Sequence, residues 1–408
     1  MRVILASLLA GFLVSASVLA QTAAAPAGVV ARLPDSQRLL SELTPLGAVT
    51  AGNGADIPPW RGGVRMPPPT ALAGQSRVAV YADDPVVQVI DSSNWQSHRQ
   101  YLAMGLQALF QNNPDFRIPL YPSRRTAAAP ESVYDAIYRN SVRVETERGR
   151  LSGQYALGGI IFPLPKTAQE RVWNHLSRWR GAGRQAVVED WSPVADGWQR
   201  MRWQLTETHP FYLDPHQPLA VEPLFERRLQ SEQGTIVELA DTRTGVQRDM
   251  RGERAGDNSF PAVEDRDMFS GRPSDYVWTL LGSREMYVPY NQDPARLPDL
   301  LPGAHPPTAT LRFEKHRVWL VDGVLRKSGT GLYQKRVFYI DEDSSAILMA
   351  DLYDSDGRLW RFNMALPVCW YEIPALVSIA EISHDLLAGR YAVSGWPVGM
   401  DYGFAQTP

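Results

Sequence analysis

Three adjacent acids, Asp341, Glu342 and Asp343, are the side chains in this sequence whose types and spacing come closest to chemistry. A pair of carboxylates can act as acid and nucleophile in glycoside hydrolysis. These acids, however, follow an apolar strand-like run and precede two serines, which is typical of a turn between strands. We therefore expect them to be solvated turn residues and not catalytic groups.

Other residues that could bind metals or ligands give weaker patterns. The chain has 7 His, and the closest pair around an aromatic turn, His209 and His216, has a spacing that matches no standard zinc site. The turn at 354–357 begins like a calcium loop but lacks the closing Glu, so it indicates a hairpin. The sequence also lacks a nucleophile elbow, a zinc-protease motif, a P-loop and a dinucleotide-binding fingerprint. We expect no enzyme activity, no metal and no cofactor.

The stretch 335–366 around the three acids predicts three antiparallel strands joined by two turns. A three-residue loop at 355–357 would set Asp351 directly opposite Arg361, an attractive pair across the ladder. The same register gives one sheet face that is entirely apolar. That face comprises Phe338, Ile340, Ala346, Leu348, Ala350, Leu352, Trp360, Phe362 and Met364. It could pack on a filled core or line a cavity for an apolar ligand, and spacing alone leaves both readings open.

Helical patterns precede this region, and strand patterns surround it. Residues 92–112 predict one helix with Leu102, Leu106 and Phe110 on its apolar stripe. A second helix is predicted after Pro130, and a third after Thr167, which forms a capping box with Glu170. Strand patterns dominate from 187 onward, while the polar segment 249–275 indicates a long loop.

Composition and the N-terminus indicate an exported protein. With 41 basic and 44 acidic side chains in 408 residues, the charge gives no case for nucleic acid as a partner. The apolar run after Arg2 ends in Val18-Leu19-Ala20, which favours a cleaved signal peptide at 1–20 over a retained membrane anchor. No cysteine follows that run to accept a lipid anchor, and the single Cys369 has apolar neighbours, which predicts a buried thiol.

The domain boundaries follow from these patterns. We expect a flexible leader at 21–41 and one domain at 42–408. That domain would begin with a Gly/Pro-rich arm at 43–63, anchored by Trp60.

Several stretches together resemble domain-of-unknown-function family 1329, which is grouped with the outer-membrane lipoprotein-sorting proteins of LolA/LolB-like fold. The resemblance covers about residues 42–391. The stretches that carry it are LTPLGAVTAGN, IPPWRGG, YPSRRTAAAP, GGIIFPLPKTAQERVWNHLSRWRG, DRDMFSGRPSDYVW, REMYVPYN, HRVWLVDGVL, KRVFYIDEDSSAILMADLYDSDGRLWR and AGRYAVSGW. The segment 243–248 departs from the basic strand expected there.

The resemblance implies an α+β fold, a strongly curved antiparallel half-open β-barrel with helices packed in its mouth. It also implies a periplasmic carrier of lipids or other hydrophobic molecules, with peripheral or transient membrane contact. A resistance-nodulation-division exporter and an outer-membrane β-barrel are the partners it suggests. On this reading the groove wall would be Phe338, Ile340, Leu348, Leu352, Trp360, Phe362 and Met364, and the lid would be Leu102, Leu106 and Phe110.

Two other functions remain open at this point. The 12 Trp could form stacking platforms in a secreted hydrolase or sugar-binding protein. Alternatively, the Gly/Pro-rich arm could lie across an outer-membrane barrel in a docking partner that binds no ligand.

Overall fold

The computed structural model describes residues 35–67, 79–143, 145–147, 150–152, 158–213, 224–241, 245–252, 260–297, 303–399 and 403–404. The predicted signal peptide, most of the predicted leader and His216 lie outside these residues. No helix in this described part is long and apolar enough to cross a membrane.

One large sheet dominates the molecule. Its order is β1-β2-β11-β12-β13-β14-β15-β16-β5-β6-β7-β8-β9, with β10 also paired to β11 and β17 to β5. Every pairing is antiparallel except the contact of β2 with β11. Its strands are β1 (Gln88–Ile90), β2 (Ile118–Leu120), β5 (Gly183–Val194), β6 (Gly197–Thr208), β7 (Phe225–Gln230), β8 (Gly234–Asp241), β9 (Gly245–Gly252), β10 (Tyr276–Pro289), β11 (Phe313–Leu325), β12 (Lys335–Asp341), β13 (Ile347–Tyr353), β14 (Leu359–Trp370), β15 (Ala375–Asp385), β16 (Arg390–Pro397) and β17 (Gly403–Phe404).

Helices are few and short. A separate hairpin consists of β3 (Glu145–Glu147) and β4 (Arg150–Ser152). The α-helices are α1 (Met104–Asn112), α2 (Glu131–Arg143), α3 (Ala168–Ser177) and α4 (Pro210–Leu213). The 3₁₀ helices are η1 (Asp35–Leu40), η2 (Trp95–Tyr101), η3 (Val263–Met268), η4 (Pro273–Asp275), η5 (Pro294–Arg296) and η6 (Thr308–Thr310).

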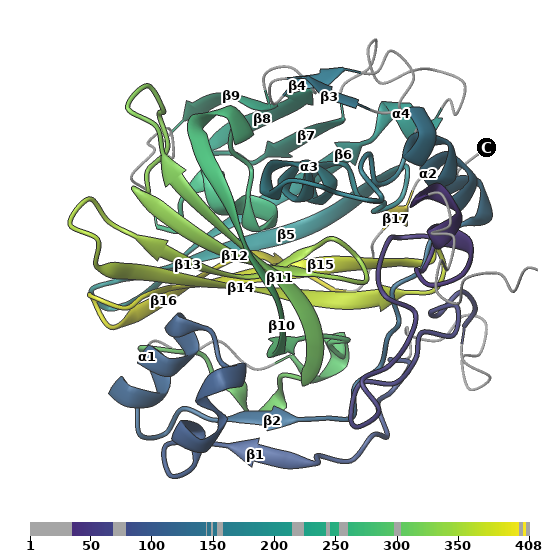
Figure 1. The fold of residues 1–408 in the computed structure, drawn as a ribbon. Helices are drawn as coiled ribbons and strands as arrows, with labels where there is room; N and C mark the ends of the chain where they lie inside the picture. The colour runs from purple at the N-terminus through teal and green to yellow at the C-terminus, as the bar shows by residue number, and fades with distance from the viewer. Residues whose placement is uncertain are drawn as a thin grey trace, which may run out of the picture.

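The sheet curves strongly, and its two sides are covered by different elements. The part formed by β5–β9 folds over the part formed by β10–β16, and α3 lies between them (Figure 1). The other side of β12–β14 carries α1, with β1 and β2 beyond it (Figure 1). The α+β class and the open antiparallel sheet predicted from the sequence are confirmed. Because both sides are covered, strands β12 and β13 are buried along nearly their whole length.

Most predicted elements are present, with two corrections. The helices after Pro130 and Thr167 form as α2 and α3, and the Thr167–Glu170 capping box is present. The single helix predicted at 92–112 is wrong, because an extended Leu102-Ala103 step divides it into η2 and α1. The loop predicted at 249–275 is also wrong in part: the end of β9 and all of η3 and η4 lie within it, and Asp265, Arg266 and Asp267 are buried.

The predicted register of the 335–366 strands is wrong in both hairpins. Between β12 and β13, Phe338 pairs with Ala350 and not with Leu348, a shift of two residues that keeps the faces. Between β13 and β14 the shift is one residue. Tyr353 pairs with Leu359, but Leu352 pairs with Arg361, so Trp360 is an extra residue at a bulge. Asp351 therefore faces Phe362 and not Arg361. One extra residue in β14 makes the residues that follow it point to the opposite face of the sheet. The apolar residues that were expected on a single face therefore lie on both faces of the sheet.

Candidate functional site

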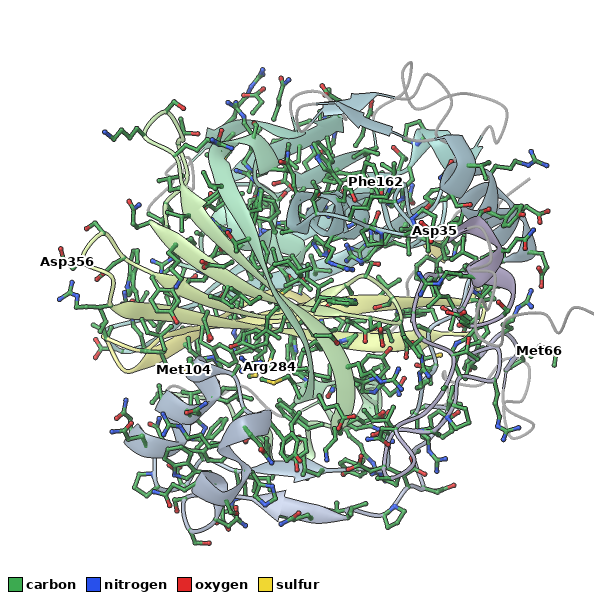
Figure 2. The ribbon with its side chains drawn as sticks, viewed as in Figure 1. Asp35, Met66, Met104, Phe162, Arg284 and Asp356 are labelled. Carbon is green, nitrogen blue, oxygen red and sulfur yellow. The ribbon has the colours of Figure 1, made fainter. Side chains whose placement is uncertain are left out.

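A groove of about 670 Å³ lies between the η2–α1 segment and the strands β10–β13. Its wall on the sheet side comes from alternate residues of β11 and β12, chiefly Leu320, Val337 and Tyr339. Leu281 joins them from an irregularity in β10. Figure 2 shows Met104 and Arg284 on the same side of the sheet, and both line the groove. The volume lies in the range of small-molecule sites, roughly 300–1,000 Å³.

Most of the groove is apolar, and its polar groups lie mainly toward solvent. The apolar lining residues are Leu102, Met104, Leu281, Met286, Leu320 and Val337. Met104 and Leu281 are 47% and 50% exposed, so apolar surface continues to the rim. Arg99, Arg284 and three glutamines contribute the polar part of the lining.

A buried carboxylate fixes α1 to the floor of the groove. Asp351 accepts hydrogen bonds from the Gly105 N–H at 2.8 Å, the Met104 N–H at 3.2 Å and the Tyr339 hydroxyl at 2.7 Å. The two N–H groups belong to the first turn of α1, which leaves such donors unpaired and favours negative charge. Burial raises the pKa of Asp351 to about 6, and the three hydrogen bonds oppose that rise.

Only glycine fits where α1 meets the sheet. A Cβ on Gly105 would lie 2.1 Å from Cγ of Phe362. The helix backbone therefore rests directly on the Phe362 ring, which stacks in turn on His384. This contact sets the distance of α1 from the strands and so the height of the groove.

The residues predicted from the sequence to form the groove wall and the lid lie in several different parts of the structure. Phe362 and Met364 lie beneath α1, on the face of Asp351, whereas Phe338, Ile340 and Leu352 lie on the opposite face with Arg361. Leu348 and Trp360 lie at the two register irregularities. None of these residues lines the groove. Of the lid candidates, Leu102 lines it, while Leu106 and Phe110 are buried in the main core.

The expectation of a solvated acidic turn is wrong. Asp341, Glu342 and Asp343 are 1%, 8% and 4% exposed. Both oxygens of Asp343 bind Arg125, at 2.6 and 2.9 Å, and Arg125 also donates to the Val49 carbonyl of the N-terminal arm. Trp60 donates to the Ala127 carbonyl, which confirms it as an anchor of that arm. The acids therefore help to attach the arm to the sheet.

His316 joins two of these acids in a group that could in principle bind a metal. One ligand atom from each of His316, Asp341 and Asp343 lies within 4.8 Å of the others. A metal would compete with Arg125 for Asp343, and the second ring nitrogen of His316 is 3.0 Å from Glu314. Burial is the largest influence on Asp341 and raises its pKa to about 6. The arrangement fits a hydrogen-bonded charge network better than a preformed metal site.

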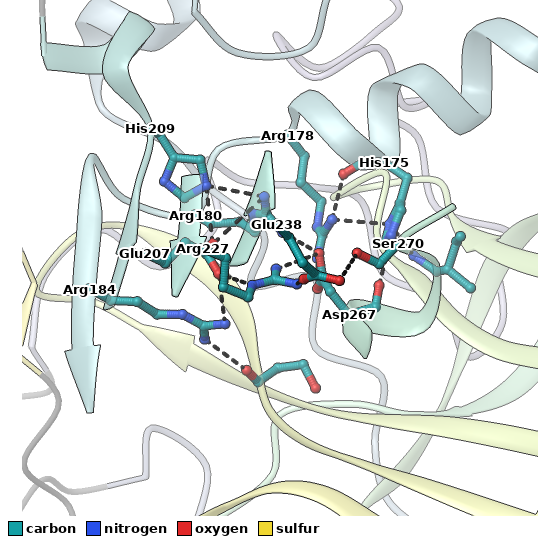
Figure 3. Close-up of polar contacts among 12 residues, drawn as sticks. His175, Arg178, Arg180, Arg184, Glu207, His209, Arg227, Glu238, Asp267 and Ser270 are labelled. Atoms are coloured by element: carbon teal, nitrogen blue, oxygen red, sulfur yellow. Dashed lines mark hydrogen bonds and ion pairs between the residues drawn. The ribbon is translucent and has the colours of Figure 1, made fainter. Parts of the chain in front are cut away.

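A second polar cluster fills the space between the sheet and α3 (Figure 3). Five charged residues of alternating sign are direct cross-strand neighbours on β5–β9: Arg184, Glu207, Arg227, Glu238 and Arg248. Arg227 binds Glu207 at 2.7 Å and Glu238 at 2.8 Å. Asp267 of η3 adds ion pairs with Arg178 and Arg180, which follow α3. We call these eight residues the buried ion cluster.

Mutual pairing keeps the buried ion cluster charged. Burial alone would raise the pKa of Glu207, but Arg227, Arg184 and Arg180 hold it well below the ordinary value. Burial lowers the pKa of His209 to about 4, so this ring is neutral at pH 7. The adjoining cavity measures about 20 Å³, room for about one water molecule. The cluster therefore joins β5–β9 to α3 and η3 and leaves no space for a substrate.

Sequence reasoning missed the buried ion cluster, although a signal was present. In β7 and β8 the buried positions alternate, and Arg227 and Glu238 occupy inward positions of that alternation. Charged residues at inward positions of an alternating strand predict cross-strand ion pairs once the pairing is known. The pairing itself could not be read from one sequence.

Comparisons with known proteins identify a family. The model of the family described as "Protein of unknown function (DUF1329)" matches residues 89–230 and 249–407. The chain is 29% identical over 395 residues to the uncharacterized protein PA3922 of Pseudomonas aeruginosa, covering 88% of this chain and 87% of that protein.

Two solved structures are similar at low identity. A DUF1329 family protein from Desulfovibrio piger has a TM-score of 0.37 and 10% identity, covering 55% of this chain and 86% of that one. The LolA superfamily protein NE2245 from Nitrosomonas europaea has a TM-score of 0.33 and 13% identity, covering 60% of this chain and 96% of that one.

Proposed function

The chain belongs to the DUF1329 family, and from that premise and the geometry of the groove we propose that it is a binding protein that carries an apolar molecule through water. The observation that supports this is the groove of about 670 Å³ with an apolar lining that continues to its rim. An apolar chain held there gains about 0.8 kcal/mol for each CH₂ group removed from water. A chain of ordinary lipid length would then stay bound during transit.

The same proposal places the carrier in the periplasm, on the signal-peptide pattern of residues 1–20. In such a pathway the cargo would pass between an exporter in the inner membrane and a barrel in the outer membrane. The groove lining contains one carboxylate among its described residues, Asp351, and its oxygens already accept hydrogen bonds from α1 and Tyr339. A glycosidase requires two facing carboxylates, and the described lining of this groove has only one.

The first test is native mass spectrometry, with solvent extraction, on mature protein purified from its own compartment without detergent. We expect an additional mass that extracts as an apolar molecule. A protein that remains without ligand even after incubation with lipid vesicles would contradict the carrier function.

Two lining residues allow the groove itself to be tested. Charged substitutions at the buried Leu352 or Phe362 would unfold the chain and test nothing. Met104→Glu and Leu281→Glu instead alter half-exposed lining residues. We expect this double variant to fold and to lose most of the extracted ligand. Leu387→Glu is the matched control, because Leu387 is 53% exposed and lies in the turn before β16.

A further inference from the structure

The rim of the groove carries two arginines without acidic partners. Arg284 of β10 is exposed, and its side chain has no hydrogen-bond or ion-pair partner in the described part of the chain. Arg99 of η2 is also exposed and donates to the neutral Gln107 side chain at 3.0 Å. Both line the same groove. Most other arginines of the sheet are paired with acids, as Arg227 and Arg336 are.

No carboxylate at the groove competes for these two guanidinium groups. Asp351 is the acid among the described lining residues, and it is fully buried. Its oxygens accept from Gly105, Met104 and Tyr339, so they are occupied at the floor. The rim therefore keeps unneutralised positive charge beside an apolar wall.

Resting on the carrier function above, we propose that the cargo is an anionic amphiphile with a single long apolar chain. Its chain lies against Leu320, Val337 and Met286, and its head group binds Arg99 and Arg284. Arginine suits this role because its planar donors bind carboxylate and phosphate oxygens in pairs. Carboxylate and phosphate share this chemistry.

The volume of the groove sets the number of chains. A methylene group occupies about the volume of a water molecule in the liquid, about 30 Å³. The 670 Å³ of the groove then holds on the order of 20 such groups. That is enough to cover one long chain with its head group, whereas the two chains of an ordinary phospholipid would extend beyond the groove.

The experiment compares three probes with the same chain and different head groups: hexadecanoate, hexadecyl phosphate and hexadecanol. Their binding to the delipidated mature protein is measured by displacement of a fluorescent apolar probe, below the concentration at which each forms micelles or separates from solution. The variant is Arg99→Gln with Arg284→Gln. Arg228→Gln is the control, because Arg228 is an exposed strand arginine on β7, away from the groove.

We expect at least one anion to bind about tenfold more tightly than hexadecanol, an increment of about 1.4 kcal/mol. The double variant should lose that preference and keep its affinity for hexadecanol, and the control should change neither. Whichever anion binds more tightly, hexadecanoate or hexadecyl phosphate, identifies the head group.

The failures are distinguishable. If all three probes bind with equal affinity, the anionic head group is wrong and the carrier function stands. If the double variant keeps the preference for anions, the assignment to Arg99 and Arg284 is wrong. If no probe displaces the dye or binds, the carrier function itself is contradicted.

Discussion

Asp351 is both a fully buried carboxylate on the floor of an apolar groove and the acceptor that binds the start of α1. Because burial raises its pKa to about 6, the folded protein binds a proton at this site more tightly than the unfolded chain does. Its contribution to stability is therefore greatest below the ordinary carboxyl pKa and is lost as the pH rises toward the raised value.

Asp351→Asn should remove this part of the pH dependence. Between about pH 4 and pH 7 the wild type should lose up to about 3 kcal/mol of unfolding free energy at this site, and the variant should not. Urea unfolding at several pH values measures the difference between the two proteins. Asp356→Asn in the exposed 354–357 turn serves as control. Parallel pH profiles for wild type and Asp351→Asn would show that this carboxyl does not titrate as described.

Arg227 holds the central position of the buried ion cluster. Arg227→Met would leave Glu207 and Glu238 buried with one partner fewer, so we expect a loss of about 3–5 kcal/mol in unfolding free energy. The neighbouring Arg228→Met changes an exposed side chain and should stay within about 0.5 kcal/mol of wild type. Equal effects of the two substitutions in chemical denaturation would refute the role assigned to the cluster.

At the scale of elements, α1 is positioned by its close contact with β14 and not by the helix propensity of its own residues. Gly105→Ala would place a methyl group against the Phe362 ring, so α1 must shift away from β14. We expect a loss of about 1–3 kcal/mol, typical of overpacking. Thermal unfolding measures it, and Phe362→Leu combined with Gly105→Ala should recover part of the loss by making room. If the double variant loses as much unfolding free energy as the two single variants lose together, the two residues act independently and this contact is contradicted.

The elements also show where sequence reasoning succeeds. The cap at Thr167 was predictable because a capping box depends on residues three positions apart. The division of 92–112 was not, since nothing local distinguishes Leu102-Ala103 from a continuing helix, and both η2 and α1 contribute residues to the groove. The register of β13 and β14 failed because a turn of given length does not reveal a bulge beside it.

At the scale of the whole molecule, the sheet is continuous because β16 returns to pair with β5. The buried ion cluster and η3 add contacts between the strands β5–β9 and the rest. We expect one cooperative thermal transition for the mature protein, with far-ultraviolet circular dichroism and tryptophan fluorescence giving coincident curves. Two separated transitions would indicate that β5–β9 and β10–β16 are independent units.

The sequence by itself determined the family, the α+β class, the N-cap of α3 and the three strands of 335–366, because these depend on local pattern or on long matching stretches. Leu102, expected in a lid, is one of the residues that line the groove. Only the tertiary structure decided which face of the sheet meets the groove, because the segment η2–α1, distant in sequence, packs on the face of β12 and β13 that carries Tyr339 and Asp351. Likewise, the three acids at 341–343 became buried because Arg125, distant in sequence, pairs with Asp343. The pairing of distant charged residues and the register of the strands both depend on the whole assembled sheet. Local patterns in one sequence therefore do not determine them.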